Sequence, residues 1–336
     1  MQNGISIGPL QVAGNVFLAP MAGVTDLPFR RQVRRYGCAL VYSEMIASGQ
    51  MLRASAATLR MSTPCADEFP MGVQLAGCEP EVMAEAARMN QDRGAALIDI
   101  NMGCPVKKVV NGWAGSALMR DETQALGIIS AVVNAVSIPV TLKMRTGWDE
   151  HTRNAPSLAR RAQDAGVKLI TVHGRTREQL YRGRADWDFI GEVKNAVSIP
   201  VIGNGDVTTV DEASELLRRS NADGVMIGRG AFGRPWFPAQ VQTFLNTGVR
   251  QPDPEPAERR DVLFAHYDAL LSHYGEYKGL RIARKHLAWS VAGLPSANRF
   301  RDLVMTEENP DRVRAMIQSF FDASGGTSGG VLAEAA

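Results

Sequence analysis

The sequence lacks the features of a secreted or membrane-anchored chain. Only 4 of its 336 residues are cysteines, and no two of them form a CxxC pair. This pattern argues against a disulfide framework and against a zinc site. No stretch approaches the roughly 18 apolar residues that span a bilayer, and the N-terminus shows no basic flank and apolar core of the signal-peptide type. We therefore expect a cytoplasmic protein with no membrane contact and no metal ion.

A large excess of charge is also lacking. The formal net charge is +2, so a nucleic acid would have to be met by a local basic patch. Apolar residues make up 45% of the chain and charged residues 21%, which are ordinary proportions for a globular protein. The length of 336 residues suffices for one large domain and one small one.

Eight apolar segments are predicted to be strands, with helices between them. They cover 15–21, 39–43, 71–75, 97–102, 140–145, 169–173, the residues from 201, and 224–227. The heptapeptide NAVSIPV occurs at 134–140 and again at 195–201, each time as a helix end, a turn and the start of a strand. Eight strand–helix units in roughly 220 residues predict an α/β fold, the (β/α)8 TIM barrel. The competing doubly wound sheet more often carries GxGxxG after its first strand, and this sequence does not.

The composition changes at 247–256, where one glycine and three prolines indicate a linker. We expect a TIM-barrel catalytic domain over residues 1–245, a linker over 246–256 and a C-terminal all-helical domain over 257–323. Helices are predicted there at 257–274, 280–291 and 310–323. The segment 324–336 is rich in Gly, Ser and Ala and is expected to be disordered.

In a TIM barrel the active site lies at the carboxyl ends of the strands. Cys104 follows the apolar strand at 97–102 and precedes a basic, glycine-rich segment. A buried structural cysteine is the alternative, but these polar surroundings favour a functional thiol. The other strand ends carry polar and cationic residues, among them Gln74, Asn101, Lys143, Arg145, His173, Arg175, Asn204 and Arg229.

Glycine-rich turns follow the last two predicted strands, at 203–206 and 228–230. At this place in a barrel, backbone N–H groups can bind a phosphate, and Arg229 can add a charge-assisted contact. The turns therefore favour a phosphate-bearing cofactor or substrate. Lys143 has three interpretations: a solvated lysine, a Schiff-base nucleophile, or a cation facing an electron-rich group.

Several longer motifs follow one another along the chain: LAPMAGVTDLPFR at 18–30, DINMGCP at 99–105, KMRTG at 143–147, HGRT at 173–176, NGD at 204–206 and RIARKH at 281–286. Together they resemble the tRNA-dihydrouridine synthases, and most closely their bacterial B-type branch. The resemblance covers about 15 to 320, in the order that the family has.

This resemblance implies a barrel that binds FMN, which NADPH reduces, and a helical domain that binds tRNA. The reduced flavin would transfer hydride from N5 to C6 of specific uridines, and Cys104 would give a proton to C5, yielding 5,6-dihydrouridine. Asn101 and Arg145 would contact the uracil. The residues expected to hold FMN are Pro20, Met21, Ala22, Gln74, Lys143, His173, Asn204, Gly205, Asp206, Gly228 and Arg229.

Two groups of cations are candidates for contact with tRNA phosphates. Lys107 and Lys108 lie beside Cys104, and a helical stripe is predicted to contain Lys278, Arg281, Arg284 and Lys285. A solvated helix face is the commoner outcome for such a run, and the resemblance favours tRNA.

Three other functions fit parts of the pattern. An FMN-dependent reductase or dehydrogenase of a free pyrimidine-like molecule would share the phosphate turns and the cysteine, without needing the basic helical domain. A Schiff-base aldolase would use Lys143. A tRNA-binding or regulatory protein with an inactive barrel is the non-enzymatic alternative, and the intact Cys104 argues against it. The sequence indicates no protein partner.

Overall fold

The computed structural model describes residues 4–325. It divides into two compact units. The barrel unit holds the chain up to Ala231 together with Trp236–Arg250, and the helical unit holds Phe232–Pro235 together with the chain from Gln251 onward.

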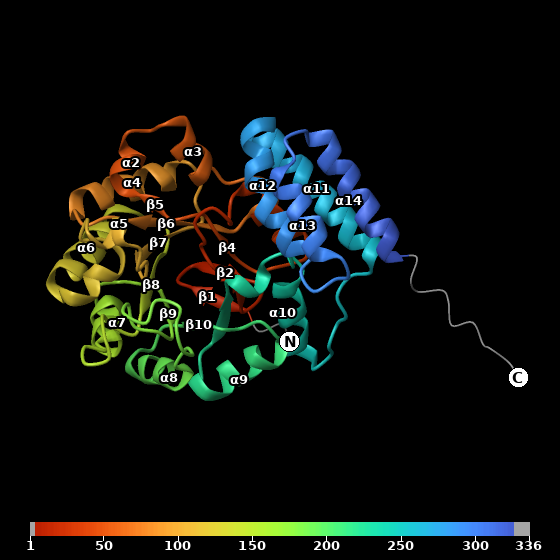
Figure 1. Cartoon of the computed structure of the whole chain (residues 1–336). Helices are drawn as coiled ribbons and strands as arrows, with labels where there is room; N and C mark the ends of the chain where they lie inside the picture. The colour runs from red at the N-terminus through yellow and green to blue at the C-terminus, as the bar shows by residue number, and fades with distance from the viewer. Residues whose placement is uncertain (1–3, 326–336) are drawn as a thin grey trace, which may run out of the picture. The chain divides into compact units, whose positions relative to one another are not determined.

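Eight parallel strands form a closed barrel, as predicted (Figure 1). The sheet order is β3-β11-β10-β9-β8-β7-β6-β4, and a bridge between Phe17 and Leu40 joins the two ends. The short β5 (Ile46–Ala47) also pairs with β6. The barrel strands are β3 (Val16–Leu18), β4 (Val41–Tyr42), β6 (Met71–Ala76), β7 (Leu97–Met102), β8 (Val140–Arg145), β9 (Leu169–His173), β10 (Val201–Asn204) and β11 (Gly224–Ile227).

The first two barrel strands are shorter than predicted. β3 ends at Leu18, although Ala19 still donates from its backbone nitrogen to Ile227 at 2.8 Å. Pro20 has no N–H with which to continue the ladder. The prediction that the strand extends to Met21 is therefore wrong, and residues 21–24 form a turn at the mouth of the barrel, closed by a hydrogen bond from the Val24 nitrogen to the Met21 carbonyl at 2.9 Å.

Helices surround the strands, and side-chain caps fix several of their starts. Asp26 accepts from the backbone nitrogen of Phe29 at 3.0 Å and caps α1. The long helices of this unit are α1 (Leu27–Arg35), α4 (Pro80–Asp92), α6 (Glu122–Ala135), α7 (Ala155–Asp164), α8 (Trp187–Ala196), α9 (Val210–Ser220) and α10 (Phe237–Thr247). The shorter helical segments are α2 (Ser48–Leu52), α3 (Ala56–Ser62), α5 (Lys107–Val110), η1 (Ala66–Glu68), η2 (Gly115–Arg120) and η3 (Arg229–Ala231).

The barrel interior is apolar toward the amino-terminal ends of the strands. Phe17, Leu97 and Leu169 belong to one buried cluster there. A hairpin of β1 (Ile5–Ile7) and β2 (Leu10–Val12) packs against the same cluster. The sequence pattern does not predict this hairpin, because three-residue strands are too short to show a clear alternation. The polar side chains of the barrel lie toward the carboxyl ends of the strands.

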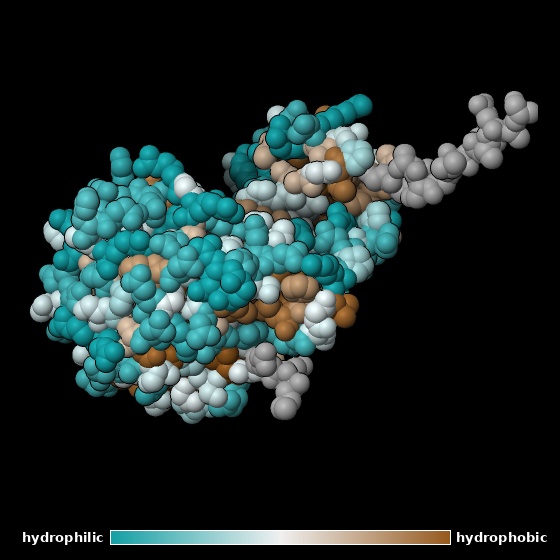
Figure 2. Space-filling view, turned by 90° about the horizontal axis from the view of Figure 1, so that it is seen from below, coloured by the Kyte–Doolittle hydropathy of each residue, from teal (hydrophilic) through white to brown (hydrophobic). Residues whose placement is uncertain are grey.

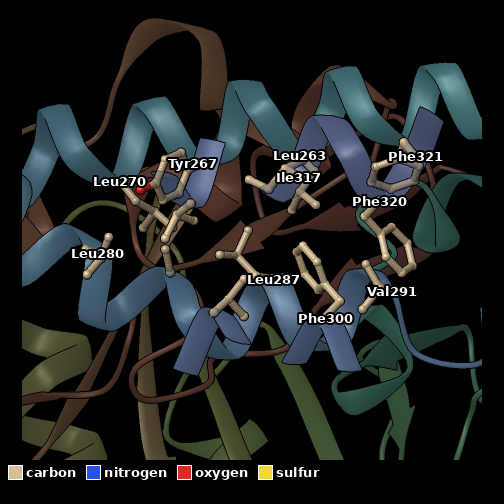
Figure 3. Packing of buried hydrophobic residues seen from close by; sticks show 13 residues of the cluster. Leu263, Tyr267, Leu270, Leu280, Leu287, Val291, Phe300, Ile317, Phe320 and Phe321 are labelled. Carbon is tan, nitrogen blue, oxygen red and sulfur yellow. The ribbon is translucent and has the colours of Figure 1, made fainter. Parts of the chain in front are cut away.

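The helical unit has a core of its own (Figure 3). It consists of α11 (Pro256–Tyr274), α12 (Glu276–Ser290), α13 (Ala297–Thr306) and α14 (Pro310–Gly325). Buried aromatic rings such as Phe300 and Phe320, whose centroids lie 4.9 Å apart, fill the space between the helices. The sequence pattern does not predict α13. The predicted disordered tail from 324 lies outside the described residues, apart from Ser324 and Gly325, which α14 includes.

Hydrophilic residues predominate on the face that Figure 2 shows, and the apolar residues on it are confined to patches. Among residues 4–325, no helix combines the length and the apolar character of a membrane span.

Candidate active site

Alternate residues of the central strands bring polar side chains to the carboxyl end of the barrel. Asn101 on β7 lies opposite Lys143 on β8, and Arg145 lies opposite His173 on β9. Because side chains alternate along a strand, Asp99 lies on the same face of β7 as Asn101. All of these groups except His173 are buried, so they must find partners within the protein.

A chain of hydrogen bonds links Asp99 and Asn101 through Gln74, which lies on the neighbouring strand β6. Gln74 Nε2 donates to Asp99 Oδ2 at 2.6 Å, and Asn101 Nδ2 donates to Gln74 Oε1 at 2.7 Å. Asp99 Oδ1 also accepts from Thr141 Oγ1 at 2.7 Å. The Asp99 carboxylate thus orients the amide of Gln74, and Gln74 orients the amide of Asn101. We call Asp99, Gln74 and Asn101 the amide relay.

The amide relay ends at the loop that carries Cys104. Asn101 Oδ1 accepts from the backbone nitrogens of Gly103 at 3.1 Å and Cys104 at 2.9 Å. On the other side, Ser116 donates to the Cys104 carbonyl from its backbone nitrogen at 3.1 Å and from Oγ at 2.9 Å. The half-buried thiol is thus held at the end of β7. Burial raises the pKa of Cys104 above its ordinary value, so the thiol keeps its proton at neutral pH.

Lys143 is a buried cation in the same mouth. Its Nζ donates to Asn204 Oδ1 at 3.1 Å, and Asn204 Nδ2 donates to the Met226 carbonyl at 2.8 Å. Burial lowers the pKa of Lys143 to about 8, while the nearby Asp99 carboxylate opposes this shift. Burial raises the pKa of Asp99 to about 6. A lysine oriented by a hydrogen bond to an amide carbonyl is placed as a fixed cation.

Arg145 holds two loops of the mouth. It donates from Nε to the Gly103 carbonyl at 2.8 Å, and from Nη1 to the carbonyls of Thr176 at 2.8 Å and Leu180 at 2.9 Å. Its guanidinium also lies 5.7 Å from the centre of the Tyr181 ring. These contacts give the side chain a structural task that the sequence does not reveal.

Arg175 contacts both His173 and Asp206. The guanidinium lies 3.3 Å from His173 Nε2 and 2.6 Å from Asp206 Oδ2. Asp206 also meets Arg229 at 3.4 Å, and Arg229 is half-exposed. Burial, with Arg145 next in importance, lowers the pKa of His173 well below its usual value, so this imidazole is neutral.

The two glycine-rich turns differ in what they require. At Gly205 the backbone has φ +125°, and an added Cβ would lie 2.7 Å from the Cβ of Ala185. Glycine is therefore needed by the fold itself. At Gly228 an added Cβ would meet only ordinary contacts, the nearest being Met21 Sδ at 3.6 Å. Packing within the protein does not demand glycine there, and the small residue leaves space at the mouth.

The remaining candidates lie at the rim or in the helical unit. Pro20 and Met21 are half-buried and Ala22 is exposed, and the Met21 backbone nitrogen donates to Thr25 Oγ1 at 2.9 Å. Lys107 and Lys108 are exposed on α5. On α12, Lys278 and Arg281 are exposed, whereas Arg284 and Lys285 are half-buried.

Arg284 does not join an exposed stripe. Its Nη2 donates to the carbonyl of Glu307 at 3.0 Å, at the end of α13. The exposed part of the predicted stripe consists of Lys278 and Arg281, whose guanidinium lies 3.6 Å from the centre of the Tyr277 ring.

Several residues of the site are not among the candidates from the sequence. Asp99 and Thr141 lie within apolar strands, and the signal that points to Asp99 is its two-residue spacing from Asn101. Ser116 and Tyr181 come from loops whose path the sequence does not give.

Known proteins share sequence with most of this chain. The family model described as dihydrouridine synthase matches residues 17–324. A probable tRNA-dihydrouridine synthase of Rickettsia bellii is 52% identical over 94% of this chain and 98% of its own length. The tRNA-dihydrouridine synthase B of Xanthomonas axonopodis pv. citri is 50% identical over 95% of this chain and 96% of its own length.

Solved structures support the fold. An old yellow enzyme homologue from Zymomonas mobilis has a TM-score of 0.56 at 14% identity, covering 75% of this chain and 94% of that one. At this identity the likeness shows only that the two proteins share a fold. The family model and the relatives lead to one conclusion: this chain belongs to the dihydrouridine synthase family.

Proposed function

We propose that this chain reduces the C5–C6 double bond of uridines in tRNA to 5,6-dihydrouridine, with Cys104 as the general acid. The observation that carries the proposal is a half-buried cysteine on a loop whose backbone is fixed at the mouth. Asn101 holds its backbone from one side, Ser116 holds it from the other, and burial raises its pKa. A general acid must carry its proton at working pH and lie within reach of the reacting atom.

We propose FMN as the cofactor, by resemblance to the family, and the residues at the mouth fit it. The turns at Gly205 and Gly228 can present backbone N–H groups to the phosphate, and the half-exposed Arg229 can add its charge. Gln74 and Lys143, which come from other strands of the barrel, offer N–H donors to the polar edge of the ring system. When bound, the flavin supplies the hydride that adds to C6.

We assign the FMN contacts to Pro20, Met21, Ala22, Gln74, Lys143, His173, Asn204, Gly205, Asp206, Gly228 and Arg229. The Asp206 side chain is already engaged by Arg175, so we assign its contribution to the backbone. His173 is neutral and would act as a hydrogen-bonding group rather than as a cation. NADPH as the reductant rests on the resemblance, and so does the cytoplasmic location.

The uracil would be oriented by Asn101 and Arg145. Asn101 gives one amide hydrogen to Gln74 and has a second for a uracil carbonyl. Lys143 would stabilise negative charge that develops during reduction. Cys104 would then transfer its proton to C5, and the resulting thiolate would be reprotonated from solvent.

A base can reach this mouth only after it leaves the helical stack. We assign the RNA backbone contacts to exposed cations, namely Lys107 and Lys108 beside the mouth and Lys278 and Arg281 on the helical unit, with Arg284 and Lys285 behind them. This agrees with a net charge of only +2, because the cations are local.

The test uses the purified chain with FMN, NADPH and unmodified tRNA, and measures dihydrouridine by mass spectrometry of the digested RNA. Parallel reactions contain free uracil or uridine, and NADH in place of NADPH. We expect dihydrouridine in tRNA and no reduction of the free pyrimidines. Reduction of a free pyrimidine alone would favour a small-molecule reductase, and no reduction of either would refute the proposed activity.

A further inference from the structure

One exposed aromatic side chain near Cys104 has no role in the mechanism above. Trp113 exposes 60% of its surface to solvent, although tryptophan is usually well buried. Its backbone lies in the left-handed region, with φ +53°, where a residue with a Cβ is strained. Strain of this kind is retained where a fixed side-chain position is useful.

Trp113 is held firmly in this position. Its backbone nitrogen donates to the Val110 carbonyl at 3.0 Å, and the next residue, Ala114, donates to Val109 at 3.2 Å. The chain then enters the buried segment 114–119. Since Ser116 makes two hydrogen bonds to the Cys104 carbonyl, Trp113 is tied to the loop of the proposed acid through the short segment 114–116.

One arginine contacts the ring, and further cations lie on neighbouring segments. The Arg120 guanidinium lies 5.7 Å from the centre of the Trp113 ring and 4.8 Å from that of Trp148, whose other neighbour is Arg177 at 4.6 Å. Lys107 and Lys108 are exposed on the preceding helix α5. An accessible ring among lysines and arginines is the combination that binds single-stranded nucleic acid, since bases stack on the ring and cations meet the backbone.

We infer that Trp113 is a stacking platform for a tRNA base next to the uridine that enters the mouth. When that uridine leaves the helix, a neighbouring base loses its stacking partner, and the Trp113 ring replaces it. This inference rests on the proposed function. It makes Trp113 a determinant of tRNA affinity, acting on the RNA outside the reacting base.

The variants are Trp113→Gly, Trp113→Phe and, as a matched control, Phe69→Leu. Phe69 exposes 53% of its surface but precedes β6, at the end of the barrel opposite Cys104. Glycine removes the ring and also relieves the backbone strain. We therefore expect Trp113→Gly to raise the KM for tRNA about 5- to 150-fold, the effect of losing one base–aromatic stack, with a melting temperature that does not fall.

We expect Trp113→Phe to keep most of the affinity and Phe69→Leu to keep all of it. A second readout is tryptophan fluorescence, because stacking quenches the indole. Titration with tRNA should quench the wild type more than Trp113→Phe.

A wild-type KM in Trp113→Gly, an equal rise in Phe69→Leu, or equal quenching in wild type and Trp113→Phe would overturn the inference. So would a change of oligomeric state in Trp113→Gly with unchanged KM, which would assign the ring to a protein interface. If the wild type forms no dihydrouridine in tRNA, the proposed function fails. If it does and Trp113→Gly binds normally, only this inference fails.

Discussion

Every hydrogen bond of the amide relay is donated toward Asp99. Reversing the donors and acceptors along the relay is therefore a sharp test of the site. Asp99 can only accept, so Gln74 must turn its NH2 toward Asp99 and its carbonyl toward Asn101. Asn101 must keep its carbonyl on the backbone nitrogens of Gly103 and Cys104, which can only donate. Both ends of the relay are therefore fixed.

Only one of the two single substitutions leaves a mismatch that no amide rotation can remove. In Asn101→Asp the carboxylate introduced at position 101 faces the carbonyl of Gln74, so two acceptors meet. In Asp99→Asn the new amide can accept from Gln74 with its carbonyl and donate from its NH2 to Thr141 Oγ1, because a hydroxyl can also accept. A buried group without a partner costs about 1–3 kcal/mol. We expect Asn101→Asp to lower the free energy of unfolding by about 2 kcal/mol and, at neutral pH, Asp99→Asn to lower it by less than about 1 kcal/mol.

The double variant Asp99→Asn/Asn101→Asp restores every pair. The amide introduced at position 99 would donate to the carbonyl of a rotated Gln74, whose NH2 would then donate to the carboxylate introduced at position 101. That carboxylate would still accept from the backbone of Cys104, and it would stay near Lys143, because position 101 lies opposite Lys143 on β8. We expect a loss of less than about 1 kcal/mol, and a coupling energy of about 2 kcal/mol between the two positions.

Urea unfolding of the four proteins measures this coupling. Alkylation of Cys104 in each of them reports whether its loop has moved, and it should be fastest in Asn101→Asp. A double variant that loses as much stability as the two single variants together would refute the relay.

Three further predictions concern titration and packing. Because burial raises the folded-state pKa of Asp99 from 3.8 to about 6, its contribution to stability is complete below pH 4 and is lost as the pH rises through 6. The difference in unfolding free energy between wild type and Asp99→Asn should thus change by about 3 kcal/mol over this range, and a flat difference would contradict the burial of the carboxyl. Because burial also raises the pKa of Cys104, its alkylation by iodoacetamide should have a midpoint at higher pH than that of an exposed cysteine peptide, as peptide mass spectrometry can measure; a lower midpoint would indicate a thiolate. Finally, Arg30 and Glu68 form a fully buried ion pair at 2.7 Å, so Glu68→Ala should cost about 3–5 kcal/mol in thermal or urea unfolding, and a loss below 1 kcal/mol would show that Arg30 finds another partner.

Much of the fold follows from local pattern. The strands at 140–145 and 169–173 are found where the sequence predicts them, since apolar runs of this length are local signals. The short hairpin β1–β2 has no such signal. The end of β3 depends on Pro20, whose missing N–H stops the ladder before the apolar run ends.

The candidate site is only partly predictable for a similar reason. Residues such as Cys104 and Asn101 can be placed at the mouth, because they end strands. The partners of Arg145 come from loops far along the chain, and loop paths depend on tertiary packing. The sequence gives Arg145 a place at the mouth, but not its bonds to three carbonyl groups.

The most direct test of the account is single-turnover dihydrouridine formation by Cys104→Ala, with Cys65→Ala as the control at the opposite end of the barrel. The enzyme is loaded with reduced FMN and mixed with unmodified tRNA, and the RNA is analysed over time. Loss of a general acid should slow formation by about 100-fold or more, while tRNA binding and the Cys65→Ala rate stay unchanged. A Cys104→Ala rate within about twofold of wild type would show that another group supplies the proton, and would contradict the central role of this thiol.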